Sequence, residues 1–374
     1  MGKRDAFNFK IDNHVKYNAL SEVNPIQVGS YTIDYVFKSL VSSERFINIF
    51  DDFSSVRTTL SLIDSNFQYD LFKFASEGTN YILKIAVYSS DNCLENEFNT
   101  LKQLSVKCYG LAPLPILYDR IHDSSDTCIM ITTYENSDSF TDLSTGDLAY
   151  NLGTIANTLS FIHEKTEVSQ SQETTDLLNR FSEISDYESN LDSDTYNEYM
   201  NIHLYTECSD FVTRLKSDIS SSIGSLNENK TCICHTDLSR SRILYREGNV
   251  KFINWQDSFV LDMYFDVAFT LFNLGIYDTD LGEIFIEKYH SSHENLGGIS
   301  LDDFKTKLTS YTDVVYKLVL VKIISNHFYE NIVYGNERTT KYVRLDRIYE
   351  CLRKLVARDY PNDLSRCDKL FINF

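Results

Sequence analysis

Apolar and polar positions divide the start of the chain into a helix and a run of strands. After an irregular leader over residues 1–30, residues 31–50 carry apolar side chains at helical spacing. From Ser61 the pattern is that of strands. Residues 69–75 alternate between apolar and polar side chains, and residues 80–87 form a β-rich run after a Glu-Gly-Thr turn. These two runs predict a β-hairpin.

The predicted hairpin is followed by a helix and two more strands. Residues 91–104 repeat apolar side chains at helical spacing, and Pro113 and Pro115 end this helix and open an extended run. Residues 127–134 form a segment typical of a buried strand. The predicted order is therefore strand, strand, helix, strand, strand.

The rest of the chain is mainly helical. A polar stretch after Tyr134 predicts a hinge between two domains, and residues 146–164 predict a helix with one apolar face. Residues 176–222 predict one or two further helices, a short β-pair is expected within residues 231–254, and helices follow from residue 263 onward. The pattern predicts an α+β protein in three parts, which are an N-terminal leader and helix (1–55), a small β-rich domain (56–135) and a large helical domain (136–374).

The composition is that of a globular protein with an acidic surface. The chain has 374 residues, of which 43% are hydrophobic and 24% charged, and its formal net charge is -19. Such a surface repels nucleic-acid phosphates and anionic lipid, so neither is expected as a partner, and a small cationic molecule is the better candidate. Solubility alone explains the charge as well.

No segment is typical of a targeting or membrane-spanning sequence. Residues 1–13 hold no apolar run long enough for a signal peptide, and no stretch of about 18 uncharged apolar residues occurs. The eight cysteines form no CxxC pair and have no Cys/His spacing that suits zinc. Reduced, buried thiols in a cytoplasmic protein are the simplest interpretation.

The most informative residues lie between positions 234 and 268. Cys234-His-Thr-Asp-Leu-Ser-Arg-Ser-Arg-Ile-Leu244 is followed by Phe252-Ile-Asn-Trp-Gln-Asp257 and then by Asp262-Met-Tyr-Phe-Asp-Val-Ala268. This assembly resembles the aminoglycoside phosphotransferase and choline kinase-like family, in which a His-x-Asp loop, an Ile-Asp-Trp strand and an Asp-Pro-x-x-Asp-Leu-Ala motif follow one another. The resemblance implies a protein-kinase-like fold with a small nucleotide-binding lobe and a large helical lobe.

The upstream strands agree with this resemblance. Lys84 lies mid-strand, where the family places the lysine that holds the nucleotide phosphates, and Glu97 on the next helix matches its glutamate partner, with Glu95 as the competing choice. A buried ammonium must be paired, whereas an outward-pointing edge lysine also fits the alternation. Leu159-Ser-Phe-Ile-His163 resembles the family's Leu-x-x-Leu-His helix, in which the histidine is expected to pack rather than react.

The resemblance also implies roles in phosphoryl transfer, where catalysis is mostly positioning and charge stabilisation. Asp237 would accept or orient the proton of the attacking hydroxyl, and His235 would fix the catalytic loop. Asp266, with Asp262 nearby, would brace that loop from the start of a helix. Simple capping of this helix accounts for both aspartates equally well.

The magnesium-binding positions depart from the family pattern. Arg242 stands in place of a metal-binding asparagine, and Asn254 stands in place of a metal-binding aspartate. Asn254 still offers a carbonyl oxygen to a metal, whereas Arg242 offers no acceptor and adds a positive charge. Asp257 and Asp262 could rebuild a site. We expect the Arg242 guanidinium near the place of the missing magnesium, and a solvent-facing side chain is the alternative.

Two further regions bear on ligands. The loop over residues 63–68 has no glycine, and Asn66 is its candidate for close approach to a phosphate. Residues 173–210 hold ten acidic side chains and one basic side chain, Arg180. The resemblance implies an acceptor site for an amine-bearing molecule there, and a solvated helix surface explains the charge as well.

The sequence therefore supports two functions. One is phosphoryl transfer from ATP or GTP to a hydroxyl of a small amine-bearing acceptor, with an impaired magnesium site, and retention of Asp237 and Lys84 favours it. The other is a pseudokinase, which is a binding or regulatory module, with a protein partner, that has lost the transfer reaction. Arg242, Asn254 and the glycine-free loop favour this second function.

Overall fold

The structure is a computed structural model that describes two compact parts of the chain. The described residues are 31–65, 69–87, 93–121, 127–136, 138–139, 145–168, 217–223, 226, 231–246, 248–296 and 298–334. One unit comprises Met1–Lys102 with Pro113–Asn136, and the other comprises Gln103–Ala112 with Ser137–Phe374. The domain boundaries that the sequence predicts after residues 55 and 135 stay predictions.

The first unit is built on a five-stranded antiparallel sheet with the strand order β1-β2-β3-β5-β4. The strands are β1 (Ser61–Ser65), β2 (Asp70–Ser76), β3 (Thr79–Val87), β4 (Pro115–Ile121) and β5 (Thr127–Thr133). The predicted hairpin is β2-β3, and its turn places Glu77 and Gly78 at φ 49° and 76°. Glycine adopts such angles without strain, which explains its position at this tight turn.

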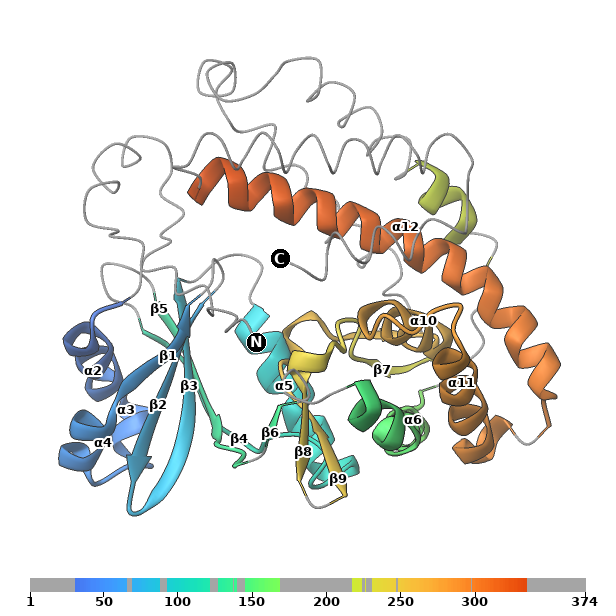
Figure 1. Ribbon diagram of the computed structural model, residues 1–374. Coiled ribbons are helices and arrows are strands. Elements are labelled where there is room, and N and C mark those ends of the chain that lie inside the picture. Colours follow the sequence, from blue (N-terminus) through green and yellow to red (C-terminus); the bar gives the residue numbers. More distant parts are fainter. Residues whose placement is uncertain are drawn as a thin grey trace, which may run out of the picture. The chain divides into compact units, whose positions relative to one another are not determined.

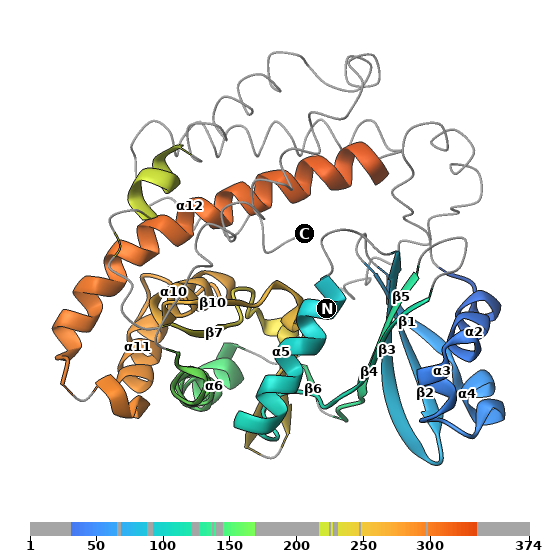
Figure 2. The same cartoon turned by 180° about the vertical axis from the view of Figure 1, so that it is seen from behind.

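Three helices cover one face of this sheet in both views (Figures 1 and 2). They are α2 (Ile33–Ser42), α3 (Glu44–Ile47) and α4 (Phe53–Thr59). The helical segment predicted over residues 31–50 is thus two helices, because Ser43 has extended backbone angles and its hydroxyl caps α3 by accepting the Phe46 N–H at 3.1 Å. Val36, Leu40, Phe46 and Phe50 share one core with the sheet.

The other face of the sheet lies against helix α5 (Cys93–Lys107). Side chains alternate along β3, so that Leu83 and Ile85 join the core under the three helices, whereas Ala86 packs with Leu94 of α5. Lys84 therefore lies on the α5 side of the sheet. This arrangement positions the first part of the candidate site.

The second unit combines short strands with long helices. Strand β7 (Cys232–Cys234) pairs with β10 (Phe259–Leu261), and β6 (Asp138–Ser139), β8 (Ile243–Arg246) and β9 (Asn249–Phe252) form a small sheet. The predicted β-pair is the β8-β9 hairpin. The helices are α6 (Thr145–Thr166), α10 (Met263–Asn273), α11 (Asp280–Ser292) and α12 (Leu301–Tyr334), with α6 packed against α11 and α10 against α12.

Several sequence-based expectations lie outside the described residues. These are the leader over 1–30, the phosphate-loop residue Asn66 and the acidic segment 173–210. Across the part of the chain that the structure describes, no helix combines the length and the apolar character needed to cross a membrane.

Candidate active site

Lys84 and Glu97 form a buried ion pair in the first unit. The Lys84 Nζ lies 2.6 Å from Glu97 Oε2, and the two side chains are 7% and 3% exposed. The Tyr69 ring lies beneath the ammonium, with its centroid 4.4 Å from Nζ. Glu95, the competing partner, is exposed. The ion pair expected from the sequence is present, and the edge-lysine alternative does not hold.

In the second unit, Asp266 holds the backbone of the His-x-Asp loop. Its carboxylate is fully buried and accepts the N–H groups of His235 and Thr236, each at 2.7 Å. Thr236 has φ 58°, which is strained for a β-branched residue. Its hydroxyl donates to the carbonyl oxygen of Asp257 at 2.5 Å. The aspartate thus braces the loop in addition to lying in the first turn of α10.

His163 supports Asp266 from helix α6. Its Nε2 donates to Asp266 Oδ2 at 3.0 Å, and its Nδ1 lies 2.7 Å from the Tyr289 hydroxyl. Burial alone would lower the pKa of His163, but the hydrogen bond to Asp266 raises that pKa to about 9. For Asp266, burial would raise the pKa, and the bond from His163 leaves it below its usual value.

His163, expected from the sequence to pack, also holds Asp266 and Tyr289 by hydrogen bonds. The sequence indicates a hydrogen-bonding role for His163, because this residue lies four residues after Leu159 on the apolar face of its helix. A polar group on such a face must find a buried partner.

His235 ties the loop to the segment after β9. Its Nε2 donates to the Ile253 carbonyl oxygen at 2.9 Å, and its Nδ1 accepts the Asp237 N–H at 3.3 Å. Burial lowers the pKa of His235 and favours the neutral ring. A neutral imidazole with the proton on Nε2 satisfies both bonds. The ring also lies 4.5 Å, centroid to centroid, from Trp255.

Arg242 points at Asp237. Its Nη2 lies 2.6 Å from Asp237 Oδ2, with side chains 24% and 14% exposed. Its Nη1 is buried and has no hydrogen-bond partner among the residues described. The Arg242 side chain contacts the loop aspartate, so the solvent-facing alternative does not hold.

Neither Arg242 nor Asn254 offers a magnesium ion an anionic ligand beside Asp237, and a ligand from Asp257 stays a prediction. Magnesium takes hard oxygen ligands in octahedral geometry, and here a guanidinium already contacts the carboxylate. Asn254, at φ 65°, brings only a neutral amide oxygen. Both oxygens of Asp262 already have partners, because one caps α10 at the Tyr264 N–H (3.2 Å) and the other accepts the Tyr311 hydroxyl (2.9 Å).

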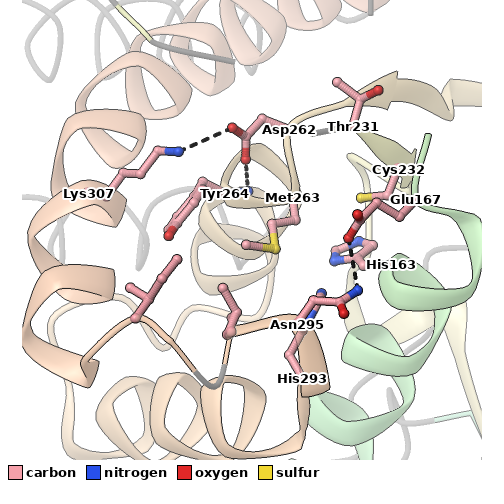
Figure 3. Close-up of a pocket in the computed structure, with 12 residues that line it drawn as sticks. His163, Glu167, Thr231, Cys232, Asp262, Met263, Tyr264, His293, Asn295 and Lys307 are labelled. Atoms are coloured by element: carbon pink, nitrogen blue, oxygen red, sulfur yellow. Dashed lines mark hydrogen bonds and ion pairs between the residues drawn. The ribbon is translucent and has the colours of Figure 1, made fainter. Parts of the chain in front are cut away.

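A cavity of about 250 Å³ borders this network, since His163 and Asp262 are among the residues that line it (Figure 3). Lys307 and Tyr264 line one side, and His163 and Glu167 line the other. Burial raises the pKa of Asp262. Lys307 opposes part of this rise, because its Nζ lies 3.5 Å from Asp262 Oδ2. None of the residues from His235 to Arg242 lines this cavity.

His163, Cys232 and Cys234 place three ligand atoms within 4.8 Å of one another. Both ring nitrogens of His163 already bind Tyr289 and Asp266. Burial raises the pKa of both thiols. The histidine of this cluster therefore supports the loop through its bond to Asp266.

Comparison with known proteins identifies the fold. No family model and no curated protein matches the chain. Among solved structures, amicoumacin kinase hAmiN in complex with AMP-PNP, Ca2+ and Ami is 13% identical, with a TM-score of 0.54, over 79% of this chain and 88% of that chain. The chain has a protein-kinase-like fold.

Two further structures agree with this assignment. A thermostable mutant of aminoglycoside phosphotransferase APH(4)-Ia, in a ternary complex with AMP-PNP and hygromycin B, is 15% identical, with a TM-score of 0.52, over 84% of this chain and 97% of that one. Spectinomycin phosphotransferase APH(9)-Ia, in complex with ADP and spectinomycin, is 16% identical, with a TM-score of 0.50, over 82% and 91%. The α+β, kinase-like fold predicted from the sequence motifs is confirmed.

Proposed function

We propose that the protein binds a nucleoside triphosphate, ATP or GTP, and transfers its terminal phosphoryl group to a hydroxyl of a small amine-bearing molecule. The observation that carries this proposal is the buried Lys84–Glu97 pair. A buried ion pair contributes little net stability, because desolvation of both charges offsets their attraction. A role in holding nucleotide phosphates accounts for the pair better than stability does.

The second unit supplies a group for the acceptor. Asp237 would take the proton of the acceptor hydroxyl while the hydroxyl oxygen bonds to the terminal phosphorus and the bond to the leaving nucleoside diphosphate breaks. Asp266 and His235 fix the backbone on which Asp237 lies. The net charge of -19 favours a cationic acceptor. Two structures of this fold were solved with both a nucleotide and a second small molecule, hygromycin B or spectinomycin.

The test is a screen of amine-bearing acceptors with ATP and with GTP, in which phosphorylated product is detected by mass spectrometry. We expect product with the native chain, a loss of nucleotide binding in Lys84→Met, and retained binding without transfer in Asp237→Asn. Absence of nucleotide binding with and without magnesium would reject the proposal. Transfer at the native rate by Asp237→Asn would reject the role of that residue.

A second function, a pseudokinase that binds nucleotide without transferring phosphate, is favoured by the Arg242–Asp237 contact of 2.6 Å. A carboxylate oxygen that contacts a guanidinium is occupied, and it is therefore less available to the hydroxyl of an acceptor. The double change Arg242→Asn with Asn254→Asp would restore two oxygen ligands. We expect it to raise magnesium-dependent nucleotide affinity in titration calorimetry, and equal affinity in both forms would contradict this account.

A further inference from the structure

We propose that Arg242 creates a metal-independent binding site for the phosphate groups of a di- or triphosphate, with the guanidinium in the role that a divalent cation would otherwise have beside Asp237. This inference rests on the nucleotide binding proposed above. Magnesium requires hard oxygen ligands, whereas Arg242 offers none and Asn254 offers only a neutral amide oxygen.

The backbone fixes the position of Arg242 on both sides. The residue ends a 3-10 turn, Arg240–Arg242, in which its N–H donates to the Ser239 carbonyl oxygen at 3.0 Å. Its own carbonyl oxygen accepts the Ile253 N–H at 3.0 Å, and the following residue, Ile243, is fully buried and paired with Phe252. The guanidinium therefore starts from a fixed point next to Asp237.

The charge of Arg242 changes what can approach Asp237. Without a cation, a phosphate near this carboxylate would be repelled, and the repulsion is strong where the groups are partly buried. The carboxylate is 14% exposed and the guanidinium 24%, so water screens the pair only in part. The arginine neutralises the carboxylate and leaves a neutral pair rather than an anion at the site.

The guanidinium also has donors to spare. Nη2 contacts Asp237, whereas Nη1 is buried and makes no hydrogen bond within the described part of the chain. A buried charged donor without an acceptor is unfavourable. Nη1 is closed to solvent in this conformation, so a phosphate oxygen reaches it only when the side chain shifts, and the new contact then removes the penalty. The planar fork of arginine matches two oxygens of one phosphate. The ligand class is therefore an anionic phosphate chain.

The experiment is titration calorimetry of the full chain in EDTA with two probes, tripolyphosphate and ATP. We expect both to bind the native protein. Arg242→Ala should weaken both by about tenfold or more, which corresponds to one charge-assisted hydrogen bond. Arg240→Ala removes the same charge from the same turn and is the matched control, with a change below about threefold.

Asp237→Asn supplies a readout that a structural role of Arg242 would not produce. It removes the negative charge and releases the guanidinium, so metal-free binding of tripolyphosphate should become tighter. Arg242→Lys keeps the charge without the fork and should lie between the native protein and Arg242→Ala. It also serves as the second variant if the alanine variant does not fold.

The possible failures separate the inference from the proposed function. ATP binding that requires magnesium, or equal binding by the native protein and Arg242→Ala in EDTA, overturns the inference and leaves the proposed function standing. Tripolyphosphate binding without ATP binding in any condition supports the inference and rejects the proposed function. Absence of binding by either probe rejects both.

Discussion

A double-mutant cycle on Lys84 and Glu97 separates what their ion pair does for stability from what it does for ligands. The variants are Lys84→Met, Glu97→Met and the double change. Removal of one partner leaves the other charge buried, at 3% or 7% exposure and without its contact of 2.6 Å. Breaking a buried pair in this way costs about 3–5 kcal/mol. Each single variant should therefore lose a large fraction of the free energy of unfolding.

The double variant should recover most of this loss. Lys84 pairs across the sheet with Leu71 and Met130, so an apolar chain at this position meets apolar neighbours. Replacement of a buried pair by apolar residues of similar volume is close to neutral or stabilising. We expect the double variant within about 1–2 kcal/mol of the native protein, and hence a coupling energy of several kcal/mol.

Urea denaturation followed by circular dichroism measures the four free energies, and calorimetry with ATP measures binding. Glu95→Gln, on the exposed side of the same helix, is the control and should change stability by less than about 0.5 kcal/mol. The double variant should be stable and yet fail to bind ATP. A double variant as unstable as the sum of the singles would refute the energetic reasoning, and native-like ATP binding would refute the role of Lys84.

The remaining predictions concern the second unit. The pKa of His163 is raised from 6.5 to about 9. The contribution of its pair with Asp266 to the free energy of unfolding is therefore complete below pH 6.5 and is lost as pH rises through about 9. A urea midpoint that stays constant from pH 7 to pH 10 would contradict this. Asp262→Ala should cost about 1–2 kcal/mol through loss of the α10 cap but leave ATP affinity unchanged, as calorimetry can check. Cys232 and Cys234 are buried with raised pKa values, so peptide mapping should show iodoacetamide labelling of them only after denaturation.

Periodicity in the sequence indicates much of the first part of the candidate site, although alternation alone also permits a lysine at the sheet edge. Alternation along β3 places Lys84 on the face opposite Leu83, and helical spacing places Glu97 between Leu94 and Leu101 on the buried side of α5. The same spacing puts Glu95 on the exposed side, so helical spacing favours Glu97, and the buried contact in the structure decides between the two glutamates.

The loop was less predictable, because its contacts come from residues distant in the sequence and from irregular backbone. Nothing local indicates that β7 pairs with β10, or that Thr236 adopts φ 58°. The two aspartates of α10 look alike in the sequence, yet Asp262 caps the helix and Asp266 accepts two loop amides. Only the three-dimensional arrangement distinguishes them.

The carboxylate of Asp266 also has a consequence for the order of assembly. It joins His163, 103 positions earlier, to His235, 31 positions earlier. The loop backbone therefore takes its final form only after α6 and α10 have met, and contacts of such long sequence separation form slowly. The amide hydrogens of His235 and Thr236 should then resist exchange with solvent until the whole unit opens. A partly folded chain whose helices have formed but not packed together lacks the hydrogen bonds that hold the loop in its native conformation.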